Sequence, residues 1–242
     1  MRAILVCVDY SDLLAVTLPH NRHHFEQVCV ITSHGDKKTA DVALANGCPV
    51  HQTDAFTRNG AVFNKWAALE EGLDWYGRRG WLCVMDADVL WPAATPPWHP
   101  MVGELWTPLR RMAPWPGPVP AERDWGRFAL HRNVQEWAGY SQIFHADDPH
   151  LGPAPWHQTD WVHAGGADSM FQRRWPQHLK RRPPFEVLHL GPAGTNWCGR
   201  ASDYADGTRP ERADEKMTML KTYVRGRAGK TGDERFRHER LK

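Results

Sequence analysis

The sequence has no long apolar run and no recognisable cysteine pattern. Its first apolar stretch, residues 3–8, is six residues long, too short for a signal-peptide core or a membrane span. The five cysteines are odd in number and form no Cys-x-x-Cys pair, which argues against a disulfide framework and against a zinc site. We therefore expect buried free thiols, a cytoplasmic protein and no membrane span.

The chain also has little net charge and no internal repeat. Its 242 residues are 24% charged and 41% hydrophobic, which is typical of one large globular domain. The formal net charge is only +2, but from residue 216 onward nine Lys and Arg face three acidic residues. Such a basic tail suits a polyanionic partner, and a solvated chain end has the same composition. No feature identifies a protein partner.

Strand and helix patterns alternate in the first part of the chain. Four apolar runs predict strands, at residues 3–8, 27–32, 49–52 and 81–85. Between them, Asp36 can cap a helix that ends at Gly47, and apolar residues at helical spacing over 62–76 predict an amphipathic helix. Strands that alternate with helices predict an α/β fold with a mostly parallel central sheet flanked by helices.

The regular pattern stops at residues 91–130, which are rich in Pro and Trp. We expect a long ordered loop here, placed to build a substrate site. Strands are predicted again at 140–145 and 185–190, and a helix is predicted from Asp168. Many of the thirteen tryptophans lie outside predicted strands. Their rings either stack on sugars or bases or pack loops onto the body.

The most informative stretch is residues 81–92, WLCVMDADVLWP. A buried strand that ends in Asp86 and Asp88 places two carboxylates at the carboxyl edge of a sheet, where α/β folds bind ligands. Mg²⁺ and Mn²⁺ are held by such carboxylates together with substrate phosphates. The stretch therefore indicates a metal–diphosphate enzyme. A solvated turn is the alternative, since Asp is common in turns.

Four features occur in a defined order along the chain. Residues 9–10 (Asp-Tyr) end the first strand, and residues 86–88 (Asp-Ala-Asp) end the fourth. Residues 165–168 (Gly-Gly-Ala-Asp) precede a final strand that contains His189. This order resembles the GT-A fold of nucleotide-sugar-dependent glycosyltransferases, with their DxD motif, glycine loop, xED motif and C-terminal histidine. The sequence departs from that pattern at the xED position, which reads Ala-Asp.

The resemblance implies a role for each matching residue. Asp86, Asp88 and His189 would hold Mn²⁺ or Mg²⁺, and Asp168 would be the base that activates the acceptor. Residues 191–200 would close over the diphosphate. The residues implied in donor binding are Val8, Asp9, Tyr10, Thr32, Ser33, Asn64, Lys65, Asp86, Ala87, Gly165, Gly166, Asn196, Trp197 and Arg200. The catalytic domain would cover residues 1–205, with 91–130 as an acceptor-side insertion and 206–242 as a basic extension.

The reaction implied is transfer of a sugar from a UDP-sugar to an acceptor hydroxyl, with inversion. Arginines at 110, 111, 123, 127 and 132 and the basic tail suit a polyanionic acceptor. In this the chain is similar to small phage, TET-associated glycosyltransferases that modify 5-hydroxymethylated bases in DNA. Synthesis of a surface glycan is the alternative acceptor chemistry.

Other classes and other residues compete with this interpretation. A dehalogenase-type DxD phosphatase expects the motif after its first strand, and a pyrophosphorylase needs a Gly-rich loop that residues 9–16 lack. A module that only binds nucleotide-sugars or DNA would leave the carboxylates without a role. His189 could be a core histidine, and Asp168 could be a helix N-cap. The rival carboxylates are Asp147, Asp148 and Asp160.

Overall fold

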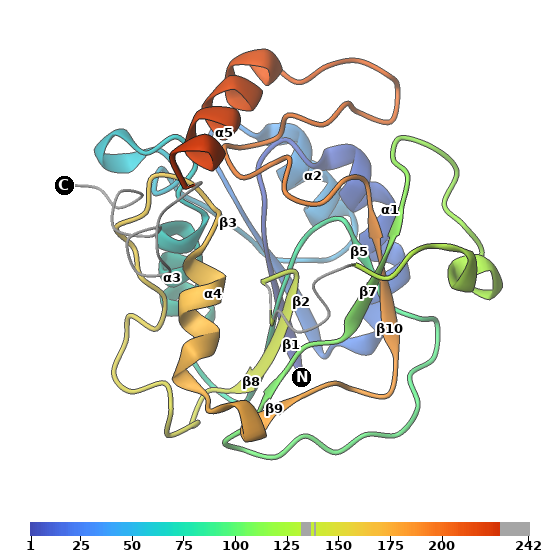
Figure 1. Ribbon diagram of the computed structural model, residues 1–242, viewed down its shortest axis with the longest axis vertical. Coiled ribbons are helices and arrows are strands. Elements are labelled where there is room, and N and C mark those ends of the chain that lie inside the picture. Colours follow the sequence, from blue (N-terminus) through green and yellow to red (C-terminus); the bar gives the residue numbers. More distant parts are fainter. Residues whose placement is uncertain (132–136, 138, 228–242) are drawn as a thin grey trace.

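The computed structural model of the protein describes residues 1–131, 137 and 139–227 (Figure 1). Its strands are β1 (Arg2–Val6), β2 (Gln27–Thr32), β3 (Val50–Gln52), β4 (Trp81–Met85), β5 (Val89–Leu90), β6 (Leu105–Trp106), β7 (Leu109–Ala113), β8 (Ser141–His145), β9 (Lys180–Arg181) and β10 (Glu186–Leu190). Its α-helices are α1 (Ser11–Asn21), α2 (Lys37–Ala45), α3 (Lys65–Tyr76), α4 (Ala167–Phe171) and α5 (Ala213–Arg227). Short 3₁₀ helices lie at Arg22–His24, Arg58–Gly60, Glu122–Arg127, Gln172–Arg174 and Gln177–Leu179.

A seven-stranded sheet in the order β3-β2-β1-β4-β8-β6-β9 forms the centre of the molecule. The neighbouring pairs from β3 to β4 are parallel, as are β6 and β9, whereas β8 runs antiparallel to both of its neighbours. The predicted α/β fold with a mostly parallel sheet is therefore confirmed. Since β8 is reversed, its first residues lie at the same edge of the sheet as the last residues of β4.

Helices cover both faces of this sheet (Figure 1). Because side chains alternate along a strand, Ala3 and Leu5 of β1 pack with α1, whereas Ile4 and Val6 pack with α3 and α4. Each face of the sheet thus packs against its own cluster of apolar side chains. The molecule therefore has three layers, with the sheet in the middle and helices on either side. The carboxyl ends of the parallel strands lie along one edge of the middle layer.

A second sheet, in the order β5-β10-β7, lies on the α1 side. Strand β10 was expected from the sequence, and it joins this small sheet rather than the central one. Strand β7 comes from residues 91–130, which were expected to form a loop. That expectation was wrong for residues 109–113, because this proline-free stretch pairs in parallel with β10 over its whole length. Strand β6 of the same segment joins the central sheet.

Local sequence signals explain most helix ends. The side chain of Asp36 accepts a hydrogen bond from the Thr39 N–H and caps α2, as predicted. The Asn64 side chain caps α3 in the same way, so this helix begins at Lys65, later than the expected start at 62. Helix α1 was not predicted. It contains Pro19 and lacks a clear apolar stripe, and the sequence therefore reads as a turn at its start.

All five cysteines are buried free thiols, as expected. Among the residues that the structure describes, no helix has the length and apolar character needed to cross a bilayer. The predicted basic extension, residues 206–242, includes helix α5, and its last residues, 228–242, lie outside the described residues. Arg132 also lies outside them. The boundary between domain and extension at residue 205 stays a prediction.

Candidate active site

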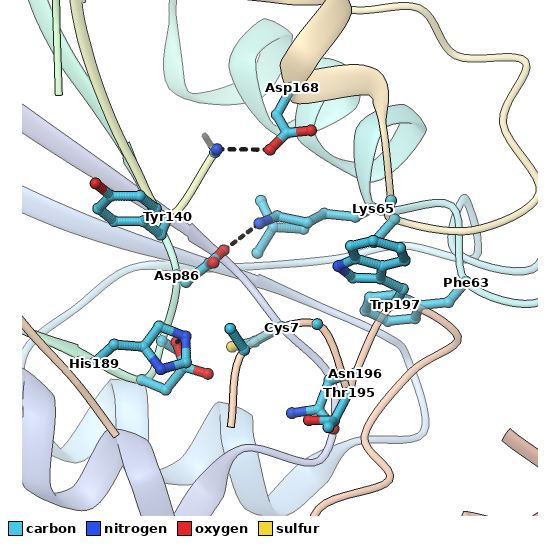
Figure 2. Close-up of a pocket in the computed structure, with 18 of the residues that line it drawn as sticks. Cys7, Phe63, Lys65, Asp86, Tyr140, Asp168, His189, Thr195, Asn196 and Trp197 are labelled. Atoms are coloured by element: carbon cyan, nitrogen blue, oxygen red, sulfur yellow. Dashed lines mark hydrogen bonds and ion pairs between the residues drawn. The ribbon is translucent and has the colours of Figure 1, made fainter. Parts of the chain in front are cut away.

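A cavity of about 770 Å³ opens at the carboxyl edge of the parallel strands. Its walls come from the ends of β1 and β4, the start of α3, the start of β8 and the loop before α4. The segment after β10 closes the remaining side (Figure 2). The predicted residues that line it are Tyr10, Lys65, Asp86, Ala87, Asp88, Gly165, Gly166, Asp168, His189, Asn196 and Trp197. Tertiary folding therefore brings together groups that are far apart in the chain.

Asp86, Asp88 and His189 form a cluster in which one ligand atom of each residue lies within 4.8 Å of the others. Asp86 and Asp88 follow β4, and His189 lies in β10. The His189 Nδ1 contacts the Gly191 carbonyl oxygen at 3.2 Å, which favours a proton on Nδ1 and leaves the lone pair on Nε2. Nε2 lies 3.5 Å from Asp88 Oδ1. Two carboxylates and an imidazole nitrogen this close together could hold a divalent cation.

Asp88 provides the most direct sign that a cation belongs here. Its Oδ1 is buried and has no hydrogen-bond partner among the described residues. A buried carboxylate oxygen without a donor is costly, and a metal ion would satisfy it. Burial, with Asp86 as a nearby like charge, raises the pKa of Asp88, although His189 opposes the shift. The residues present therefore fit a divalent cation.

Among the described residues, Lys65 is the lysine or arginine that forms an ion pair with this carboxylate cluster. It begins α3, is 7% exposed and forms an ion pair with Asp86 (Figure 2). Burial by itself would lower the pKa of Lys65, but the neighbouring carboxylates, Asp86 foremost, raise it above its ordinary value. Lys65 is therefore charged and paired with Asp86.

Asp168 lies on the opposite side of Asp86 from His189 (Figure 2). Its carboxylate accepts hydrogen bonds from the N–H groups of Gly139 and Ser169, both at 2.8 Å. Gly166 occupies the N-cap position of α4, so the N-cap alternative for Asp168 is wrong. A side chain at residue 139 would meet the Asp168 Cβ at 2.8 Å, so glycine is required there for this contact.

None of the rival carboxylates Asp147, Asp148 and Asp160 lines the cavity.

The segment after β10 is fastened over the glycine loop. The Trp197 ring packs on Gly165, where an added Cβ would lie 2.6 Å from ring atoms. The Ala164 N–H donates to the Trp197 carbonyl at 2.8 Å, and the Asn196 amide donates to the Tyr10 hydroxyl at 2.9 Å. The predicted closing segment and the predicted glycine loop are thus in direct contact.

Six predicted donor-binding residues do not line the cavity: Val8, Asp9, Thr32, Ser33, Asn64 and Arg200. Thr32 is fully buried and donates to Asp36, and Asn64 caps α3 and donates to the Thr159 carbonyl. Arg200 is 1% exposed and contacts both carboxylate oxygens of Asp12 at 3.1 Å. These three side chains organise the walls of the site. Their participation in donor binding stays a prediction.

Sequence reasoning did not assign several residues that line the cavity, notably Cys7, Phe63, Arg110, Gly139 and Tyr140. Arg110 was seen only as part of a basic segment. Gly139 and Tyr140 stand directly before β8, but no local signal shows that this strand is reversed and starts at the cavity. Burial, with Asp36 as a nearby anion, raises the pKa of the Cys7 thiol, which is therefore uncharged.

No known family model matches the chain, and no curated protein matches it in sequence. Among solved structures, mannosyl-3-phosphoglycerate synthase from Rubrobacter xylanophilus is 14% identical with a TM-score of 0.50, over 98% of this chain and 74% of that one. Glucosyl-3-phosphoglycerate synthase from Mycobacterium tuberculosis, solved with Mn²⁺ and UDP-glucose, is 13% identical with a TM-score of 0.44, over 92% and 76%.

A mycobacterial protein is also similar, at 14% identity and a TM-score of 0.45 over 78% of this chain. The chain spans 64% of the length of that protein. At such identities the likeness concerns the fold alone. The overlay with mannosyl-3-phosphoglycerate synthase and the strand order confirm the predicted GT-A fold.

Proposed function

We propose that this chain is a glycosyltransferase that uses a divalent cation and a nucleotide-sugar donor. The observation that carries the proposal is that the buried Asp88 Oδ1, within the Asp86–Asp88–His189 cluster, has no hydrogen-bond donor among the described residues and lies in the main cavity of a GT-A fold. A core histidine or a solvated turn would not leave a buried carboxylate oxygen without a donor. Similarity to two sugar-phosphoglycerate synthases agrees with this class of reaction.

Asp88 and His189 would hold Mn²⁺ or Mg²⁺, with Asp86 shared between the metal and Lys65. A bound divalent ion would offset the charge that develops on the leaving diphosphate. Lys65 provides a fixed ammonium group in the same wall of the cavity, so the leaving group would meet a cation that the fold has already positioned. Residues 192–197, which line one side of the cavity, would limit the access of water to this region.

For the transfer itself we propose an inverting reaction with Asp168 as the base. Asp168 accepts the proton of the acceptor hydroxyl while that oxygen bonds to the anomeric carbon of the sugar. The bond between the anomeric carbon and the phosphate oxygen breaks, and its electron pair leaves with the nucleoside diphosphate. The N–H groups of Gly139 and Ser169 hold the Asp168 carboxylate in one orientation for this step.

The proposed donor is a UDP-sugar, with the nucleotide at the end of the cavity formed by Tyr10, Asn196 and Trp197. These side chains lie beside the end of β1, where α/β folds bind nucleotides. Calorimetry should show that UDP with Mn²⁺ binds more tightly than GDP, CDP or ADP. Preference for another nucleotide would overturn this assignment alone.

For the acceptor we propose a 5-hydroxymethylated base in DNA. The support for this acceptor is the set of arginines at 110, 111, 123, 127 and 132 together with the basic tail, of which Arg132 and residues 228–242 lie outside the described residues. We also propose a cytoplasmic location. Mass spectrometry of hydroxymethylcytosine DNA, incubated with the protein and a panel of sugar nucleotides, should show a hexose mass increase. Unmodified DNA would favour a surface-glycan acceptor.

The test of the enzyme class is release of UDP from UDP-sugars in the presence of Mn²⁺. We expect turnover with Mn²⁺ or Mg²⁺ and none in excess EDTA. Full activity in EDTA would contradict the metal role. Binding of the UDP-sugar without any turnover, over the same acceptor panel, would favour a module that only binds nucleotide-sugars.

A further inference from the structure

Two consecutive arginines on β7 have opposite surroundings. The Arg111 guanidinium forms an ion pair with Glu186 of β10 and also donates to the Phe128 carbonyl. Arg110 points to the other face of the small sheet and lines the cavity, as His189 does on the neighbouring strand. No carboxylate among the described residues lies within 4 Å of the Arg110 guanidinium, whereas Arg111 has one.

The contacts that Arg110 makes with described residues fix its position and include no carboxylate. Its guanidinium carbon lies 4.2 Å from the centre of the Tyr140 ring, which is a cation–π contact. One terminal nitrogen lies 3.4 Å from the His131 Nε2, and the Arg110 Nε is buried without a hydrogen-bond partner among the described residues. A positioned guanidinium with an unused buried donor is suited to bind a carboxylate or phosphate through paired hydrogen bonds.

Arg110 lies beside the machinery proposed for the acceptor. Tyr140 holds the guanidinium with its ring, and the preceding residue, Gly139, holds the Asp168 carboxylate with its N–H. The Tyr140 carbonyl in turn accepts from the Asp86 N–H at 3.0 Å. Tyr140 and the nucleotide-end residues Asn196 and Trp197 lie on opposite sides of Asp86 (Figure 2). The cavity thus has two ends, and Arg110 is at the end away from the proposed nucleotide.

We propose that Arg110 binds an anionic group, a phosphate or carboxylate, carried by the acceptor close to the hydroxyl that receives the sugar. This inference rests on the proposed function, because it takes Asp168 as the base. An acceptor bound to Arg110 by its anionic group would present its hydroxyl towards Asp168. Arg110 would then determine which alcohols react, and neutral alcohols of the same shape would be poor acceptors.

The test is calorimetric titration of inorganic phosphate into the full-length protein saturated with UDP and Mg²⁺. We expect phosphate to bind, and Arg110→Ala and Arg110→Gln to weaken that binding at least about tenfold, the effect of losing a charged hydrogen bond. UDP–Mg²⁺ affinity should be unchanged in both variants. Arg79→Ala is the matched control. Arg79 is exposed and precedes β4, at the opposite edge of the sheet from the cavity.

Equal phosphate affinity in wild type and either Arg110 variant would overturn the inference. So would phosphate binding that is seen only without UDP, because Arg110 would then serve the donor diphosphate. Failure of the wild-type protein to bind UDP with Mg²⁺ would instead contradict the proposed function. Arg110→Gln keeps the length of the side chain, so the test does not depend on the folding of the alanine variant alone.

The source of the anion is identified by matched pairs of probes in the same titration. 5-Hydroxymethyldeoxycytidine 5′-phosphate is compared with its nucleoside, and glycerol 3-phosphate with glycerol and with glycerate. We expect each phosphate to bind at least about tenfold more tightly than its neutral partner, and Arg110→Gln to remove the difference. Preference for the nucleotide indicates DNA or a free nucleotide as acceptor, and preference for glycerol phosphate or glycerate indicates a small acid. No advantage of any anion over its neutral partner would overturn the inference.

Discussion

Helix α3 carries two buried charged clusters that differ in how their carboxylates are satisfied. In the first, Glu70 accepts from the N–H groups of His157 at 2.8 Å and Trp156 at 3.0 Å, and its Oε2 lies 2.8 Å from Arg78. The His157 ring is also 2.7 Å away. In the second, Lys65 meets Asp86 at the cavity, beside an Asp88 oxygen with no donor among the described residues.

The pKa values follow this difference. Burial would raise the pKa of Glu70, but its contacts with His157 and Arg78 lower it. Burial raises the pKa of Asp88, and its single histidine neighbour does not reverse the shift. The partners of the Glu70 carboxylate all belong to the fold, and we call this the complete cluster in that sense, although Arg78 Nη1 and His157 Nε2 have no hydrogen-bond partner among the described residues. The satisfied carboxylate therefore stabilises the fold. In the proposed function, the Asp88 cluster is completed by a bound cation, so we expect its contribution to be to activity rather than to stability.

Breaking the complete cluster should have the largest effect on stability. Glu70→Ala removes one of the two carboxylates that pair with half-buried Arg78 and leaves two buried N–H groups without their acceptor, and it should lower the free energy of unfolding by about 3–5 kcal/mol. Urea unfolding measures this change. Glu71→Ala is the control, since Glu71 is 35% exposed and should cost at most about 1 kcal/mol. Equal losses in the two variants would remove the distinction between the clusters.

Breaking the incomplete cluster should affect activity instead. Asp88→Asn keeps the shape of the side chain but weakens the metal site, and donor turnover should fall at least about 100-fold. Without metal, its free energy of unfolding should stay within about 1 kcal/mol of wild type, because the substitution removes a buried carboxylate whose Oδ1 has no hydrogen-bond donor among the described residues. Asp147→Asn, at an 84% exposed carboxylate, should change neither quantity. An Asp88→Asn enzyme of normal activity would show that the cluster is not catalytic.

His189 sharpens the comparison at the level of binding. His189→Ala should weaken the affinity for UDP with Mn²⁺ about tenfold or more, a change of about 1.4 kcal/mol in binding free energy. Calorimetry with UDP, in Mn²⁺ and in EDTA, separates the metal-dependent part. Thermal stability without ligand should change by less than about 1 kcal/mol. Strong destabilisation with unchanged UDP affinity would identify His189 as a core histidine.

The smallest effect should be a pH dependence that arises in the complete cluster. Burial holds the pKa of His157 below its ordinary value of 6.5, despite the contact with Glu70. Below that pH the unfolded chain takes up a proton that the folded protein does not, so stability is lost as the pH falls from about 7 to about 5.5. His157→Gln should flatten this part of the stability curve. A slope that is unchanged by the substitution would contradict the assignment.

Much of the site could be predicted because it depends on neighbours in the chain. The apolar run before Asp86 and Asp88 predicts a strand end, and Asp36 and Asn64 are preferred N-caps just before helical patterns. The order of the DxD, glycine-loop and histidine features identified the fold and placed Asp168 and His189 in the cavity. The expected donor-binding roles of Thr32, Asn64 and Arg200 were harder to judge. A polar side chain near a strand end can bind a ligand, or it can hydrogen-bond to other protein groups that support the site, as these three do.

The sequence by itself determined the alternation of strands and helices, the pair of carboxylates at a strand end and the free thiols, since each depends on residue type and short-range spacing. Only the tertiary structure decided that β7 and β10 form a second sheet, that β8 is reversed, and that Arg110 and Asp168 are held by adjacent residues. These are contacts between segments far apart in the chain. Which strand pairs with which, and which buried group is left without a partner, depends on the packing of the whole molecule, and no local pattern records it.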